Sequence, residues 1–127
     1  MSEVWCRGLR VTKLREADVL KAVTDYLAAR KIWFRRMNTG GVKAEYNGRS
    51  RFVRYGSPGM ADVLAVVYYG GVNAVDLTEL TRVYWLECKS ETGKQSDAQR
   101  EFQREVESRG MRYLIVRGVE DLKEAGL

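Results

Sequence analysis

The spacing of apolar side chains along the chain predicts alternating helices and strands. Residues 15–30 place apolar side chains three and four positions apart, which is typical of an amphipathic helix. A second helix is expected over residues 97–108, because Ser96 and Gln99 match a capping box. Its apolar stripe is narrow, with Ala98, Phe102 and Val106 repeating every fourth residue. A short third helix is expected over residues 119–125.

Apolar runs between these helices predict strands at residues 32–37, 63–69, 83–89 and 111–116. The run at 63–69 is apolar at every position, as expected for a central strand that is covered on both faces. Residues 42–46 and 49–55 flank Asn47-Gly48, a pair that favours a type I′ turn and therefore a hairpin. The order of these elements predicts an α/β fold with a mixed central sheet flanked by helices.

The chain is expected to form one domain over residues 1–127. Its length is sufficient to bury a core without disulfides or a structural metal. Residues 1–14 are expected to form a loose strand or an N-terminal arm, and residues 72–82 fit no single element. Because no apolar run approaches the ~20 residues of a membrane span, and charges occur throughout the first thirty residues, we expect no signal peptide, no membrane anchor and a cytoplasmic location.

Composition narrows the chemistry that the chain can perform. The sequence contains no histidine, which excludes Ser-His and Cys-His nucleophiles and the usual zinc sites. Two cysteines cannot form a disulfide framework, and Cys88 is expected to be a small buried apolar residue. A net charge of +5 favours an anionic partner, although it could also serve only solubility. Any catalysis must therefore use carboxylates, lysine and a hard cation.

Two apolar strands carry charged residues at the ends that are expected to meet. Glu87 and Lys89 point to one face of their strand because side chains alternate between faces. If the preceding strand pairs with it antiparallel, Asp62 lies at the same end of the sheet. Two carboxylates this close repel each other unless one is protonated or both bind a cation. Mg²⁺ or Mn²⁺, held by Asp62, Glu87 and the backbone carbonyl of Cys88, is the expected occupant.

Two helical residues are candidate members of this site. Glu16 lies in the first turn of the first helix, where it either complements the helix dipole or faces Asp62 and Glu87. Gln99 borders the buried edge of the second helix, near the end of the Glu87 strand. A surface ion pair between Glu87 and Lys89, worth under ~1 kcal/mol, is the plain alternative to a catalytic role for that pair.

A basic stretch precedes the first of these strands. Between residues 35 and 55 the only acid is Glu45, and the basic residues of this stretch are accompanied by the aromatic residues Trp33, Phe34, Tyr46, Phe52 and Tyr55. Such a ribbon is either a solvated edge or a cationic surface for a phosphate backbone. The candidate nucleic-acid-binding residues, which include one from the loop before the second helix, are Arg35, Arg36, Lys43, Arg49, Arg51, Arg54 and Lys94.

These residues together resemble a known family. The motifs are Ser57-Pro58-Gly59-Met60-Ala61-Asp62-Val63-Leu64, Leu86-Glu87-Cys88-Lys89 and Gly93-Lys94-Gln95-Ser96-Asp97-Ala98-Gln99-Arg100. With a helical Glu16 before them, they resemble the PD-(D/E)XK nuclease superfamily and, more narrowly, the VRR-NUC domain in its stand-alone virus-type or bacterial form. The similarity covers residues 16–122. A virus-encoded chain of this kind would act in the cytoplasm of a bacterial host.

The resemblance implies a restriction-endonuclease-like αβββαβ core and hydrolysis that uses one or two metal ions. It implies metal ligation by Asp62 and Glu87, a catalytic Lys89, and supporting roles for Glu16 and Gln99. It further implies a homodimer that cleaves branched DNA, similar to Holliday-junction resolvases. A less selective or restriction-like nuclease, and a DNA-binding module of the same fold without catalysis, are the competing interpretations.

The chain departs from the family pattern in two places. Val116-Arg117-Gly118 replaces the Val-Arg-Arg that names the family, so a role for the second arginine does not transfer. The connection at residues 72–82 is longer than the family pattern leads us to expect, and it could reshape the surface that meets a substrate or a second subunit.

Overall fold

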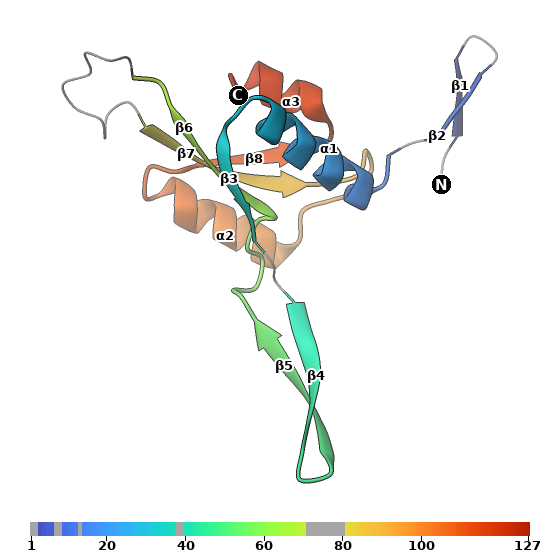
Figure 1. The fold of residues 1–127 in the computed structure, drawn as a ribbon, viewed down its shortest axis with the longest axis vertical. Coiled ribbons are helices and arrows are strands. Elements are labelled where there is room, and N and C mark those ends of the chain that lie inside the picture. The colour runs from blue at the N-terminus through green and yellow to red at the C-terminus, as the bar shows by residue number, and fades with distance from the viewer. Residues whose placement is uncertain (1–2, 7–8, 13, 38–39, 71–80) are drawn as a thin grey trace.

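The computed structural model describes residues 3–6, 9–12, 14–37, 40–70 and 81–127 (Figure 1). Their centre is a four-stranded sheet in the order β3-β6-β7-β8. Its strands are β3 (Trp33–Arg36), β6 (Val63–Tyr68), β7 (Thr81–Cys88) and β8 (Arg112–Val116). Strand β6 runs antiparallel to β3 and to β7, whereas β8 runs parallel to β7, which confirms the predicted mixed sheet.

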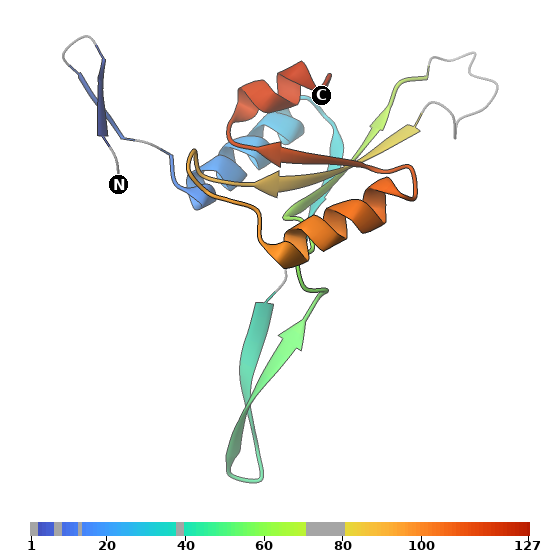
Figure 2. The ribbon, with the colours of Figure 1, turned by 180° about the vertical axis from the view of Figure 1, so that it is seen from behind.

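Three helices cover the two faces of the sheet, as Figures 1 and 2 show from opposite sides. One face packs against α1 (Glu16–Ala29) and α3 (Val119–Glu124), and the other against α2 (Asp97–Glu107). The larger core lies under α1 and α3, where Val19, Val23 and Leu27 supply the predicted helical stripe. In α2 the stripe is partly wrong, because the side chain of Ala98 is exposed while Val106 is buried.

Two hairpins accompany the sheet. The chain near the N-terminus pairs β1 (Glu3–Cys6) with β2 (Leu9–Thr12), where the sequence predicts only a loose strand or arm. The predicted longer hairpin is formed by β4 (Gly40–Tyr46) and β5 (Arg49–Tyr55). Its turn residues Asn47 and Gly48 have φ of 51° and 74°, as a type I′ turn requires.

The boundaries of the elements otherwise differ little from the prediction. Strand β7 begins at Thr81, two residues earlier than expected, and the rest of the unassigned segment 72–82 lies outside the described residues. Strand β4 begins at Gly40, two residues before the expected start at residue 42. Across the described ranges, no helix is long and apolar enough to cross a membrane.

A close contact joins the loop before β6 to the start of α2. Gly59 has φ of +75°, and a Cβ atom at this position would lie 2.2 Å from the carbonyl oxygen of Ala98. Only glycine accommodates both the backbone conformation and the contact. The loop that leads to Asp62 is therefore held against the N-terminal turn of α2.

Candidate active site

Strand β7 directs Glu87 and Lys89 away from the larger core. Leu86 and Cys88 lie in that core under α1 and α3, so the alternating Glu87 and Lys89 project from the opposite face. Both are nevertheless buried, with exposed fractions of 2% and 8%. Lys89 Nζ lies 3.7 Å from Glu87 Oε1. The pair is therefore not the surface ion pair that was the plain alternative.

Asp62 reaches the same end of the sheet from the residue that precedes β6. Val63 pairs with Leu86 in the antiparallel register, which places Asp62 beside the end of β7. Its Oδ2 accepts a hydrogen bond of 2.8 Å from the backbone N–H of Cys88. The carboxylate is therefore held by the strand that carries Glu87, as the predicted pairing requires.

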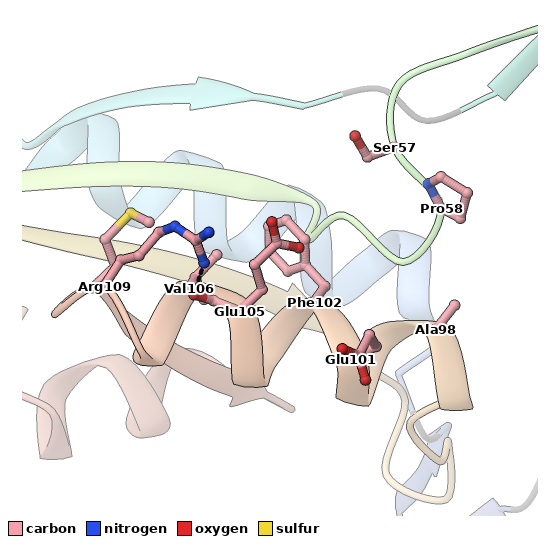
Figure 3. A pocket seen from close by; sticks show the side chains of 9 residues that line it. Ser57, Pro58, Ala98, Glu101, Phe102, Glu105, Val106 and Arg109 are labelled. Atoms are coloured by element: carbon pink, nitrogen blue, oxygen red, sulfur yellow. Dashed lines mark hydrogen bonds between the residues drawn. The ribbon is translucent and has the colours of Figure 1, made fainter.

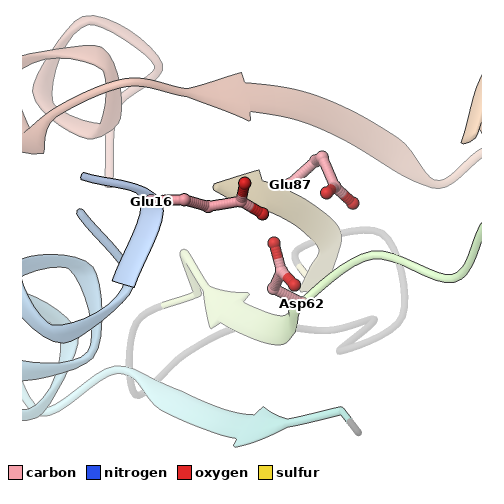
Figure 4. Close-up of side chains that lie close together, drawn as sticks. All are labelled: Glu16, Asp62 and Glu87. Atoms are coloured by element: carbon pink, nitrogen blue, oxygen red, sulfur yellow. The ribbon is translucent and has the colours of Figure 1, made fainter. Parts of the chain in front are cut away.

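Glu16 completes a group of three carboxylates, shown in Figure 4. One oxygen from each of Glu16, Asp62 and Glu87 lies within 4.8 Å of the others. The N-terminus of α1 is capped by a different acid, because the backbone N–H of Arg15 donates to Asp18 Oδ2 at 3.2 Å. Glu16 is therefore not needed as the cap, and its side chain extends toward the other two carboxylates.

Gln99 connects helix α2 to Glu87. Its Oε1 accepts from the backbone N–H of Ser96 at 2.8 Å, and its own N–H donates to Ser96 Oγ at 3.2 Å, which forms the predicted capping box. Because Oε1 is engaged in the cap, Nε2 faces the sheet and donates to Glu87 Oε1 at 3.0 Å. The helix cap thereby orients one of the site carboxylates.

The environment of Glu87 favours its protonated form when no cation is bound. Burial raises the pKa of Glu87 to about 8, and the negative charge of Asp62 adds to the rise, whereas Lys89 opposes it. Burial likewise raises the pKa of the Cys88 thiol to about 12, with Asp62 and Glu87 contributing. Cys88 is therefore a protonated core side chain and not a nucleophile.

The site offers oxygen atoms to a cation. Exposed acidic groups are common in proteins without a metal, but Glu87 is buried and its Oε2 has no hydrogen-bond partner among the residues that the structure describes. A buried, unpaired carboxylate oxygen is costly unless a proton or a cation meets it. The three carboxylates suit a hard divalent cation such as Mg²⁺ or Mn²⁺. The carbonyl of Cys88 stays a predicted ligand.

The loop that follows Lys89 is held by an arginine whose role the sequence did not indicate. Arg117 Nη1 donates to the carbonyl oxygens of Ser90 at 2.6 Å, Glu91 at 3.2 Å and Gly93 at 2.8 Å. A Cβ atom on Gly93 would lie 3.4 Å from Lys89 Cδ, so the loop lies over the stem of the lysine. Arg117 is the arginine of the Val-Arg-Gly sequence that the family resemblance already drew attention to.

The predicted nucleic-acid-binding residues whose side chains the structure describes come from three separate segments of the chain. Arg35 and Arg36 are exposed on β3, where the Arg35 guanidinium lies 4.5 Å from the centre of the Trp33 ring. Arg49 and Arg51 are exposed on the β4–β5 hairpin, and Lys94 is exposed in the loop before α2. The side chains of Lys43 and Arg54 lie outside the described residues.

A groove of about 310 Å³ lies along α2, separate from the carboxylates (Figure 3). It contains none of the predicted catalytic residues. Two glutamates, Glu101 and Glu105, line it beside a single arginine, Arg109, a balance that disfavours a phosphate backbone. The remaining lining residues are Ser57, Pro58, Ala98, Phe102, Val106 and Met111.

Comparison of the chain with models of protein families, with curated proteins and with solved structures finds no match. The geometry of the site is therefore the main basis for a functional argument. The sequence pattern did not predict that Gly59 and Arg117 shape the site. The position of Gly59, three residues before the candidate ligand Asp62, could have indicated its role. The residues next to Arg117 in the sequence do not indicate its contacts.

Proposed function

We propose that the protein is a divalent-metal-dependent nuclease that hydrolyses phosphodiester bonds in DNA. The observation that carries the proposal is the buried Glu87 carboxylate, whose Oε2 lacks a partner within the described part of the chain. Two more carboxylates lie against it. The core order α1, β3, β6, β7, α2, β8 agrees with the αβββαβ order of the resemblance, with the β4–β5 hairpin inserted. That agreement supports the same proposal.

Each site residue has a role that follows from its position. Asp62, Glu87 and Glu16 would hold Mg²⁺ or Mn²⁺, and the Cys88 carbonyl is the further ligand that we propose. When bound, such a cation polarises a phosphodiester oxygen and lowers the pKa of an attacking water. Lys89 would orient that water or stabilise the negative charge that develops on the phosphate oxygens. Gln99 positions Glu87 through its amide.

The proposed substrate class is branched DNA of the Holliday-junction type, and the proposed assembly is a homodimer. Both proposals rest on the family resemblance, since a symmetric junction requires two cuts and a dimer presents two sites. Sedimentation or light scattering would test the assembly, with a mass of twice the 14.5 kDa of one chain expected. A monomer at micromolar concentration would contradict the homodimer.

One cleavage experiment tests the activity and its selectivity. A four-way junction, a flap, a linear duplex and single strands are incubated with the protein and Mn²⁺, and the products are separated on a gel. Preferential cutting of the junction is expected. Equal cutting of all four substrates would support a less selective nuclease, and no cutting would favour a DNA-binding module without catalysis.

Variants connect that activity to the site. Asp62→Asn and Lys89→Ala are each expected to lower cleavage by at least a hundredfold, while thermal unfolding without metal changes little. Asp25 and Lys21 form an exposed ion pair on α1, so Asp25→Asn and Lys21→Ala are matched controls that should retain activity. Full cleavage activity in both Asp62→Asn and Lys89→Ala would contradict the assignment of these two residues to the active site.

A further inference from the structure

The β4–β5 hairpin extends away from the sheet and its helices, as both ribbon views show (Figures 1 and 2). Its strands pair without interruption from Gly40 opposite Tyr55 to Tyr46 opposite Arg49. Seven residues in each strand give a two-stranded ribbon about 23 Å long. Within the described residues the hairpin forms its own two-stranded sheet and is not hydrogen-bonded to the four central strands. It is therefore an addition to the central sheet and not one of its strands.

The base of the hairpin lies beside the proposed catalytic site. Strand β3 leads into β4, and β5 leads through the Gly59 loop to Asp62. The backbone N–H of Met37 donates to the carbonyl oxygen of Asp62 at 2.7 Å, which joins the chain entering the hairpin to the residue that follows it. A ligand that lies along the hairpin would therefore extend from the catalytic carboxylates.

The hairpin carries an excess of positive charge. Residues 40–55 contain four basic residues and one acid. Arg49 and Arg51 are exposed and lie on the same face of β5, because they are two residues apart. No carboxylate of the described chain is in ion-pair contact with either arginine, whereas Arg104 on α2 is paired with Glu101.

We infer that the β4–β5 hairpin is an arm that binds duplex DNA beyond the cleavage site, with Arg49 and Arg51 contacting phosphates. A two-stranded ribbon fits the major groove, which is about 12 Å wide. An arm of this length reaches roughly 7 base pairs, at about 3.4 Å for each. The inference rests on the proposed function, which identifies the nucleic acid as DNA. It goes beyond that function by stating where on the protein the duplex lies.

A second copy of the chain is the other partner that such an arm could have. Two copies of an arm with this charge would repel each other if they packed side by side, and Glu45, the single acid in residues 40–55, is too little to offset that repulsion. Charge complementarity therefore favours DNA as the partner. The oligomeric state of each variant is measured as well, so that a role of the arm in dimerisation would be detected.

The first test measures the salt dependence of duplex binding. Binding of a fluorescent linear duplex is followed by anisotropy in EDTA at several salt concentrations, so that no cleavage is needed. Each lost phosphate contact lowers the slope of log K against log salt by about 0.9, so R49Q/R51Q should reduce the slope by about 1.8. The matched control R104Q/R109Q removes the same charge from the last turn of α2 and the turn that follows the helix, and it should leave the slope unchanged.

A shortened arm tests its reach without depending on single side chains. Deleting Val42, Lys43, Phe52 and Val53 removes two registered pairs and keeps the Asn47-Gly48 turn together with Arg49 and Arg51. Because two residues leave each strand, the remaining side chains keep their faces. This variant should bind long duplexes more weakly than the wild type and bind short duplexes, under about 7 base pairs, with the same affinity.

The outcomes separate this inference from the proposed function. An unchanged slope in R49Q/R51Q overturns the arm, and so does an equal loss in the matched control. Loss of a dimer with unchanged DNA binding assigns the hairpin to a second copy of the chain and also overturns the inference. Arm-dependent binding in a protein that cleaves no substrate supports the arm and overturns the nuclease.

Discussion

At the scale of single residues, the most important feature of the site is Glu87, which is buried and has one carboxylate oxygen without a hydrogen-bond partner among the described residues. Its exposed fraction is 2%, and its Oε2 has no partner in the described ranges. Buried carboxylates are normally paired, so the residue must hold a proton or meet a cation. The elevated pKa indicates the proton as the occupant when no metal is present.

The metal-free protein should lose stability as the pH rises from about 4.5 to about 8. Glu87 titrates near its ordinary value of 4.5 when unfolded and at about 8 when folded. Between these values the native state binds a proton that the unfolded state has released, so the free energy of unfolding falls with rising pH and levels off above about 8. Urea unfolding in EDTA at several pH values measures this. In Glu87→Gln the slope should be absent, and equal slopes would contradict the assignment.

Gln99 has two functions that substitution can separate. Ser96→Ala removes only the cap bond to Ser96 Oγ and leaves the Gln99 side chain in place, so it should cost about 1 kcal/mol of stability and leave cleavage unchanged. Gln99→Ala keeps the bond to Ser96 Oγ but removes the bond from the Ser96 N–H and the hydrogen bond to Glu87, so it should cost a similar amount and lower cleavage as well. Chemical unfolding and cleavage rates of both variants provide the measurement. Equal cleavage in the two variants would show that the amide does not position Glu87.

At the scale of elements, the site depends on how the Gly59 loop meets helix α2. This contact holds the loop that leads to Asp62, and the carboxylate is in turn held by Cys88 of β7. On the other side, Arg117 joins the end of β8 to the loop after Lys89. The groups that we propose as catalytic therefore lie at strand ends whose adjoining loops are held by neighbouring elements.

Gly59→Ala should disturb this arrangement. The added Cβ would lie 2.2 Å from the Ala98 carbonyl oxygen, so the loop or the helix must shift, and the positive φ adds strain. We expect a loss of stability above about 2 kcal/mol together with a loss of cleavage. Gly48→Ala is the matched control, since Gly48 has a similar φ of +74° and nothing within 4 Å. It should cost only about 1 kcal/mol and keep the activity. Similar losses of stability and cleavage in both variants would show that the close contact between Gly59 and Ala98 is not important for the site.

At the scale of the whole molecule, the two faces of the sheet contain different kinds of residues. The face under α1 and α3 contains the larger apolar core, and the face toward α2 carries the polar residues of the site at one end. Glu16 comes from the opposite layer and reaches the site around that end of the sheet. A bound cation would therefore connect helix α1 to strands β6 and β7.

Mn²⁺ should stabilise the folded protein as a whole. A ligand at a hundred times its dissociation constant adds about 2.7 kcal/mol to the free energy of unfolding, which is roughly a 10 °C rise in Tm for a domain of this size. The rise should be larger at pH 8.5 than at pH 6.5, because Glu87 must lose its proton to bind the metal. Calorimetry with and without Mn²⁺ measures both effects. Asp62→Asn should abolish the rise, and an equal rise in that variant would contradict this site.

The sequence by itself determined the elements of the sheet and helices, the hairpin turn and the shared face of Glu87 and Lys89. These features depend on local properties: the alternation of side chains in strands, the helical period and the tolerance of Asn47-Gly48 for positive φ. Antiparallel pairing then predicted that Asp62 lies beside Glu87. The N-terminal hairpin was not predicted, because its short strands have no clear period.

Only the tertiary structure decided which side chains of different layers meet. Periodicity assigns a helix face but not the rotation or shift of the helix on the sheet, so the contacts of Gln99 with Glu87 and of Gly59 with Ala98 could not be derived. The same holds for Glu16, whose place in the first turn of α1 fitted either a dipole partner or a site residue until its distance to the other carboxylates was known. Burial of Glu87 is likewise a property of the packed layers, and it turns a charged pair on a strand into a candidate metal site.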